Sequence, residues 1–206
     1  AVSSVGGLTE ERAPGTFSVV DQFIDRTKGR PSSFYGSGMV AHVSMADPVC
    51  PRLSHLAADA ARAADAQTHE GGTYLAMEGP QFSTRAESHL YRSWGCHVIG
   101  MTAMPEAKLA REAELPYALV GMVTDYDCWR EEEAAVDVAQ VIAQLSTNAV
   151  KARAMVANLL HALPESREAS PIDTCLDTAL ITAPSARDPA LLAKLDAVAG
   201  RALAGR

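Results

Sequence analysis

Hydrophobic and polar positions follow two periods along the chain, and together they predict strands separated by helices. Short apolar runs that begin or end near Gly or Pro are typical of β-strands. Four runs fit this description, at residues 16–24, 72–77, 96–101 and 117–123. Each predicts one strand of a sheet.

Apolar residues spaced by three and four positions predict helices between and after these strands. The predicted helices cover residues 51–66, 83–94, 106–113, 136–163 and 189–204. Pro51 fits the first turn of a helix, and Asp188 fits an N-cap. Residues 165–186 are polar and interrupted by proline, so they predict a surface loop. Strands that alternate with helices indicate an α/β domain.

Composition is that of an ordinary globular protein with one core. The chain has 206 residues, of which 48% are hydrophobic and 21% charged, and this length favours a single domain over residues 1–206. No apolar stretch is long enough to span a membrane, and no secretory signal is visible. The net charge of -7 argues against nucleic acid as the main partner, although local donors can still hold a small anion.

Four cysteines are scattered along the chain, at Cys50, Cys96, Cys128 and Cys175. Their spacing fits neither a zinc site nor a disulfide framework. We therefore expect isolated thiols in a reducing compartment, and a cytoplasmic protein.

Two carboxylates follow the last predicted strand. If residues 124–127 are extended, Asp125 and Asp127 point to the same side. Neighbouring carboxylates raise each other's pKa, so one can stay protonated near neutral pH. Such a pair suits N7 and the 6-amino group of adenine. A metal pair or a solvated turn is the alternative, although no His or third carboxylate stands at ligand spacing nearby.

Two other strand ends also carry candidate chemistry. Phe82 can stack on a planar ring, and Ser83 or Thr84 can cap the following helix. Thr102, before another helix, combines a hydroxyl with free amide groups that can hold phosphate. Each pattern alone also fits an ordinary capped turn. His42 alone fits a structural histidine more readily than a functional one.

Four segments together resemble one family. Residues 20–27, 77–88, 100–106 and 124–129 occur in the order and at the intervals of the trimeric purine-nucleoside phosphorylases, and most resemble the group that acts on 5'-methylthioadenosine. The resemblance spans about residues 3–163. It implies a three-layer α/β sandwich with a central mixed sheet flanked by helices.

The resemblance also implies roles for individual residues. Asp125 would face purine N7 and Asp127 the 6-amino group, as the catalytic pair. Phosphate would contact Ser3, Ser4 and Thr102, with Ser3 in a turn at a strand end. The substrate pocket would contain Phe82, Ser83, Ile99, Gly100, Met101, Val138, Val141 and Ile142, together with His42 from a neighbouring subunit.

The implied reaction is phosphorolysis of 5'-methylthioadenosine to adenine and 5-methylthioribose-1-phosphate, in a homotrimer with active sites at the subunit interfaces. Inorganic phosphate is the co-substrate, and no metal or organic cofactor is expected. Relatives that act on 6-oxopurines carry Glu and Asn where this chain has Ser83 and Asp125, which favours a 6-aminopurine.

Other functions stay open. They are a 6-oxopurine or methylthioinosine phosphorylase, a hydrolytic nucleosidase, and a noncatalytic nucleoside-binding protein. The family's Gly-rich phosphate loop and Arg-His segment precede the position of Ser3, and neither is present here. We therefore expect this chain to be the C-terminal two-thirds of such a phosphorylase.

Overall fold

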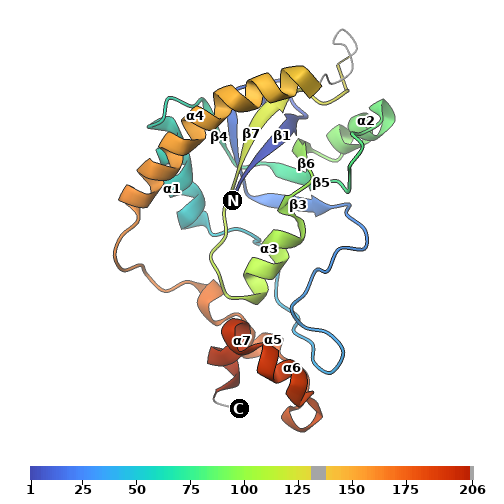
Figure 1. Ribbon diagram of the computed structural model, residues 1–206, viewed down its shortest axis with the longest axis vertical. Coiled ribbons are helices and arrows are strands. Elements are labelled where there is room, and N and C mark those ends of the chain that lie inside the picture. The colour runs from blue at the N-terminus through green and yellow to red at the C-terminus, as the bar shows by residue number, and fades with distance from the viewer. Residues whose placement is uncertain (131–137, 205–206) are drawn as a thin grey trace.

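The computed structural model describes residues 1–130 and 138–204 (Figure 1). Its strands form one mixed sheet in the order β3-β5-β6-β1-β7-β2-β4. Their bounds are β1 Val2–Gly7, β2 Phe17–Val20, β3 Gln22–Asp25, β4 Thr68–Glu70, β5 Thr73–Ala76, β6 Cys96–Gly100 and β7 Leu119–Asp125. The predicted α/β class with a central mixed sheet is confirmed.

Helices cover both faces of this sheet, as the side chains of β7 show. Leu119 and Val123 belong to the core that α3 covers, whereas Val120 and Met122 belong to the core beneath α1 and α4. Because successive residues of a strand point to opposite faces, these helices lie on opposite sides of the sheet. The predicted three-layer arrangement is therefore present (Figure 1).

The helices around the sheet are α1 Pro51–Arg62, α2 Arg85–Ser93, α3 Ala103–Glu112 and α4 Val138–Ala162. The predicted start of α1 at Pro51 is confirmed, and α1 packs along α4. Thr84, rather than Ser83, caps α2 in a reciprocal capping box with Glu87. Val136, the first residue of the long predicted helix, lies outside the described residues.

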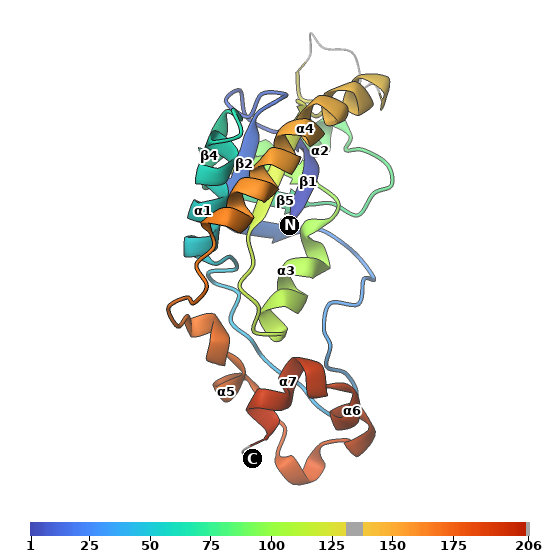
Figure 2. The same ribbon diagram turned by 60° about the vertical axis from the view of Figure 1, so that its left-hand side comes forward.

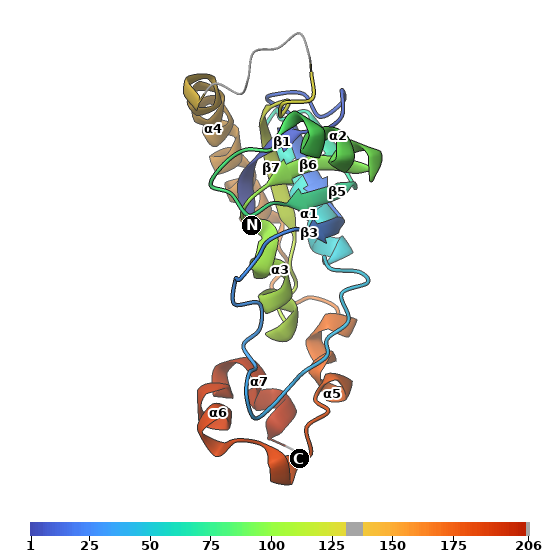
Figure 3. The same ribbon diagram turned by 90° about the vertical axis from the view of Figure 1, so that its right-hand side faces the viewer.

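A group of short helices lies at the far end of the molecule (Figures 2 and 3) and holds a second hydrophobic cluster, apart from the cores on the two faces of the sheet. The helices of this region are η1 Pro171–Thr174, α5 Leu176–Ala179, η2 Pro184–Ala186, α6 Pro189–Lys194 and α7 Asp196–Leu203, and α5, α6 and α7 contribute residues to the cluster. The chain between β3 and α1 runs out to this cluster and back, and Tyr35 and Met39 pack in it. The prediction of a surface loop over residues 165–186 was wrong, because Ile172 and Leu176 are buried there.

Other differences from the predicted elements are local. The run at residues 16–24 forms two strands, β2 and β3, which separate at Asp21. The predicted helix at 189–204 is divided into α6 and α7, although Asp188 caps α6 as expected, accepting a hydrogen bond from the Ala190 N–H at 2.8 Å. Strands β1 and β4 were not predicted. In the described part of the chain, no helix is both long and apolar enough to cross a membrane.

Candidate active site

The pairing of β1 brings the ends of two other strands together. β1 and β6 are antiparallel but pair only through Gly6 with Ile99 and Gly7 with Val98. β1 is also parallel to β7, with Gly6 opposite Asp125. The carboxyl ends of β6 and β7 therefore meet beside β1, and the residues that follow each strand face a common space.

A cavity of about 350 Å³ occupies this space. Its walls come from β1, the turns after β5 and β6, the end of β7, and α4. Most of the predicted site residues line it, namely Ser3, Ser4, Phe82, Ile99, Gly100, Met101, Thr102, Asp125, Asp127 and Val141. The sequence therefore identified residues that the fold brings together from widely separated segments.

Two hydroxyl groups face each other in this cavity. The Oγ atom of Ser3 and the Oγ1 atom of Thr102 are 2.7 Å apart. Thr102 precedes α3, but its hydroxyl does not cap that helix, and its backbone N–H donates to the Tyr74 hydroxyl at 3.3 Å. The prediction that Ser3 lies in a turn was wrong, because Ser3 and Ser4 lie within β1. The register of β1 places Ser3 beside the end of β6.

Gly100, the last residue of β6, allows a close approach at this point. A Cβ atom added there would lie 2.1 Å from the Tyr74 hydroxyl oxygen, and Tyr74 is fully buried. The glycine thus lets Tyr74 reach the Thr102 N–H.

The two carboxylates lie in a tight turn after β7. The Asp127 N–H donates to Asp125 Oδ1 at 2.8 Å, and the Thr124 hydroxyl donates to Asp125 Oδ2 at 2.7 Å. Asp127 has a φ of 51°, so the assumption of an extended segment was wrong. Aspartate tolerates this left-handed conformation better than most residues. Both side chains still line the cavity.

Asp127 is the more deeply buried of the two. Its side-chain atom Oδ2 has no hydrogen-bond partner among the described residues. Burial raises the pKa of Asp127 to about 6, and the charge of Asp125 adds to this while the Ser88 hydroxyl acts against it. The raised pKa of Asp127 therefore comes mainly from burial, and the neighbouring charge on which the sequence prediction relied contributes less.

Sequence reasoning missed the role of Trp129 near these carboxylates. Its indole N–H donates to the Gly7 carbonyl at 2.8 Å, and the Arg92 guanidinium lies 3.5 Å from the centre of its ring system. Arg92 also donates to the Leu8 carbonyl at 2.9 Å. These contacts anchor the turn that carries Asp125 and Asp127 to the end of β1. An aromatic residue two positions after a carboxylate pair was the available signal.

Three of the remaining predicted site residues, Ser83, Ile142 and His42, do not line the cavity. Ser83 is buried, its hydroxyl lies 3.8 Å from the Met77 sulfur, and its carbonyl accepts a hydrogen bond from the Cys128 thiol. Ile142 is 57% exposed. His42 is exposed beside the second cluster, between Ala41 and Val43, and its backbone N–H donates to the Ala179 carbonyl at 2.9 Å. The side chain of Val138 lies outside the described residues.

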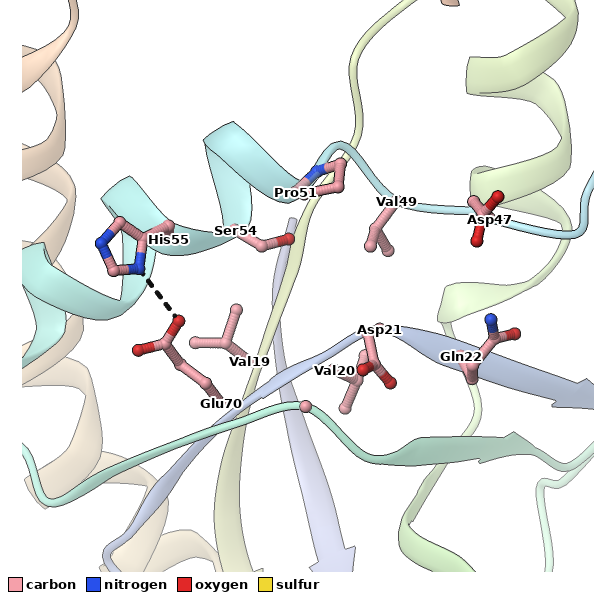
Figure 4. Close-up of a pocket in the computed structure, with 11 residues that line it drawn as sticks. Val19, Val20, Asp21, Gln22, Asp47, Val49, Pro51, Ser54, His55 and Glu70 are labelled. Carbon is pink, nitrogen blue, oxygen red and sulfur yellow. Dashed lines mark hydrogen bonds and ion pairs between the residues drawn. The ribbon is translucent and has the colours of Figure 1, made fainter.

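A second cavity of about 450 Å³ opens between the start of α1 and the junction of β2 and β3 (Figure 4). It combines an apolar floor with acidic side chains, including Glu70, whose Oε2 lies 3.2 Å from Nδ1 of His55. None of the predicted site residues lines it. Across the described residues, no group of three or more His, Cys, Asp or Glu side chains is placed to hold a metal ion.

One cavity in the mixed sheet thus combines paired carboxylates, an exposed aromatic ring and paired hydroxyls. These features are suited to binding a nucleoside and an anion. The chain belongs to the Phosphorylase superfamily, whose family model matches residues 1–161.

Two curated relatives give a more specific comparison. The chain is 63% identical over 207 residues to the S-methyl-5'-thioadenosine phosphorylase of Cereibacter sphaeroides, covering 100% of this chain and 71% of that protein. It is 61% identical over 208 residues to the protein of the same name from Bradyrhizobium diazoefficiens, again covering 100% of this chain and 71% of the relative.

Solved structures agree with these relatives. A methylthioadenosine phosphorylase from an antarctic soil metagenomic library superposes with a TM-score of 0.89 at 44% identity, over 96% of this chain and 70% of that chain. The methylthioadenosine phosphorylase of Schistosoma mansoni in complex with adenine superposes with a TM-score of 0.82 at 32% identity, over 88% of this chain and 72% of that chain. This chain is thus similar to solved methylthioadenosine phosphorylases, one of them in complex with adenine.

Proposed function

We propose that the protein catalyses phosphorolysis of S-methyl-5'-thioadenosine, giving adenine and 5-methylthioribose-1-phosphate. The observation that carries this proposal is one cavity lined both by the carboxyl pair Asp125 and Asp127 and by the hydroxyl pair Ser3 and Thr102. The first pair suits a purine that must accept a proton as it leaves. The second pair offers donors for an anion. High identity to S-methyl-5'-thioadenosine phosphorylases supports the same reaction.

The chemistry requires a proton near the purine and phosphate near the sugar. As the bond between C1' and N9 stretches, positive charge develops on the ribosyl ring and negative charge on the purine. Asp125 donates a proton to N7 and so neutralises the leaving purine. Phosphate then attacks C1' from the opposite face, while the hydroxyls of Ser3 and Thr102 hold its oxygens. Both electrons of the C1'–N9 bond leave with adenine.

The buried carboxyl makes the proton available. The pKa of Asp127 is raised to about 6, mainly by burial, and the neighbouring charge of Asp125 acts in the same direction. A proton is therefore retained within this pair closer to neutral pH than on an ordinary aspartate. In the nucleoside complex we assign it to Asp125, which faces N7, while ionised Asp127 accepts from the 6-amino group.

Shape and polarity of the pocket select the substrate. Phe82 is 51% exposed and lines the cavity, so its ring is available to stack on the purine. Met101 contacts the ribose, with Ile99 and Gly100 along the wall. Val141, which lines the cavity, provides an apolar surface for the 5' substituent. An unpaired hydroxyl there loses hydration without compensation, which favours the methylthio group over adenosine.

Assembly and location complete the proposal. We place the active sites of a homotrimer at subunit interfaces, with His42 of one subunit over the 5' group bound by the next. His42 is exposed and does not line the cavity of its own chain, as this arrangement requires. A cytoplasmic location agrees with four cysteines that are free thiols.

Competing nucleosides test the substrate. The purified native protein is assayed with phosphate and with methylthioadenosine, methylthioinosine or adenosine, and release of free base is followed by chromatography. The proposal expects the highest kcat/KM for methylthioadenosine. A higher value for methylthioinosine would favour a 6-oxopurine phosphorylase, and tight binding of adenine without turnover of any nucleoside would favour a binding protein.

A further inference from the structure

Arg30 connects the two turns that carry the site, although it does not line the cavity itself. It follows β3, at the start of the segment that runs out to the second hydrophobic cluster (Figure 3). Its side chain is only 22% exposed. The guanidinium reaches back to the turns after β5 and β6, which meet beside the cavity.

Every N–H group of this guanidinium has an acceptor. Nη1 donates to the carbonyls of Met101 and Met104, both at 2.6 Å. Nη2 donates to the carbonyl of Glu78 at 2.8 Å and to that of Met77 at 3.5 Å. Nε donates to the Glu78 carboxylate at 3.1 Å. A guanidinium has five donors in a fixed planar fork, whereas a lysine ammonium has three around a point charge.

The two bonds from Nη1 hold the backbone around Thr102, in the turn after β6. Thr102 lies between Met101 and Met104, so one nitrogen holds the backbone on both sides of it. The Thr102 hydroxyl, 2.7 Å from Ser3 Oγ, is therefore kept in place by the backbone and not by capping its own helix.

Packing links the same two turns on the cavity side. Gly79 has a φ of 69°, and a Cβ atom there would lie 2.5 Å from the Met101 sulfur. The Met101 side chain thus packs directly on the turn that Arg30 holds through Glu78. Movement of either turn would displace both Met101 and Thr102.

We propose that Arg30 is a positioning residue for anion binding, acting through Thr102 and Met101 without touching the substrate. The inference rests on the proposed function in taking inorganic phosphate as the anion. Loss of the fork should let the turn at residues 101–104 relax, so that the Thr102 hydroxyl is no longer held where phosphate binds.

The test compares Arg30→Lys with the same substitution at a matched arginine, Arg111. Arg111 also donates through its guanidinium to backbone carbonyls, those of Ser44 and Asp47, but at the opposite end of α3. Phosphate affinity is measured by thermal-shift titration with inorganic phosphate, and phosphate KM and kcat are measured with methylthioadenosine. We expect Arg30→Lys to raise both the Kd and the KM for phosphate about tenfold. This is the effect expected from losing one hydrogen bond to a charged group. Arg111→Lys should lower thermal stability without changing phosphate affinity.

A double-mutant cycle with Thr102→Val identifies the route of the effect. If Arg30 acts through the Thr102 hydroxyl, Arg30→Lys should raise the phosphate Kd by less than about twofold in the Thr102→Val background. The effects of substitutions at coupled residues are not additive. Arg30→Gln replaces Arg30→Lys in the cycle if the lysine variant does not fold. Full additivity, an unchanged phosphate Kd in the Arg30 variants, or an equal loss in Arg111→Lys would overturn the inference.

The proposed function can fail separately. If the wild-type protein binds phosphate but does not cleave methylthioadenosine, the phosphorolysis proposal falls, while the cycle measured by phosphate binding still decides the role of Arg30. If the wild-type protein binds no phosphate, both proposals fall.

Discussion

Replacing Asp127 by asparagine should remove a specific pH dependence of folding stability. Asp127 is 8% exposed, and its Oδ2 atom lacks a hydrogen-bond partner among the described residues. An ionised carboxylate in this position is poorly solvated, so folding favours its neutral form. Asparagine has nearly the same shape but does not ionise in this range.

The magnitude follows from the pKa of this group in the folded and unfolded chain. Folding raises the pKa of Asp127 from 3.8 to about 6, mainly through burial. The folded state then binds the proton more tightly, so stability falls as pH rises from the unfolded to the folded pKa. A shift of about 2 units corresponds to about 3 kcal/mol, at 1.36 kcal/mol per unit. This contribution is fully present below about pH 4 and lost above about pH 6.

Urea unfolding at several pH values between 4 and 7.5 measures this effect. The quantity of interest is the free energy of unfolding of wild type minus that of Asp127→Asn, which cancels the titration of other groups. It should decrease by about 2.5 kcal/mol across this range, since part of the effect is already lost at pH 4. Glu165→Gln, at an exposed position, gives the baseline for an acid-to-amide change. A difference that stays constant with pH, or that rises, would refute the reasoning.

Three further substitutions test other parts of the account. Asp125→Ala should lower kcat far more than it raises nucleoside KM, because its proton is needed mainly in the transition state; steady-state kinetics measure both. Gly100→Ala should destabilise the fold by about 1–3 kcal/mol in urea, since its Cβ would lie 2.1 Å from the Tyr74 hydroxyl oxygen, whereas Gly36→Ala, with open space around it, should not. Thr84→Ala should cost about 1 kcal/mol of stability by removing the α2 N-cap, with kcat nearly unchanged.

Each of these has a contrary outcome. Equal changes in kcat and KM would leave Asp125 as a binding group only. Equal stability of the two glycine variants would mean that Tyr74 can move away from β6. A Thr84→Ala protein as stable as wild type would mean that water replaces the cap.

The apolar runs predicted the strands that are buried on both faces, because nearly all residues of such a strand are apolar. Strand β1 was missed since Val2–Gly7 contains serines and glycines that give little strand signal; its pairing with β7 makes it a strand. The burial of Leu176 likewise depends on a distant segment, because Leu176 packs in one cluster with Tyr35 and Met39. Contacts between such distant segments leave no local periodicity to detect.

Prediction of the site was limited in the same way. The residue types at strand ends predicted which side chains line the cavity, but their geometry came from the fold. Asp125 and Asp127 share the cavity through a turn with a φ of 51°, and not through strand alternation. The contribution of Arg30 was invisible in the sequence because its partners are backbone carbonyls about 50 to 70 positions away.

The dependence of turnover on phosphate tests the central claim most directly. Native protein is incubated with methylthioadenosine with and without inorganic phosphate, and the sugar product is identified by mass spectrometry. The account predicts adenine release only with phosphate, with 5-methylthioribose-1-phosphate formed in equal amount. Adenine released without phosphate, together with free 5-methylthioribose, would show hydrolysis and contradict the account.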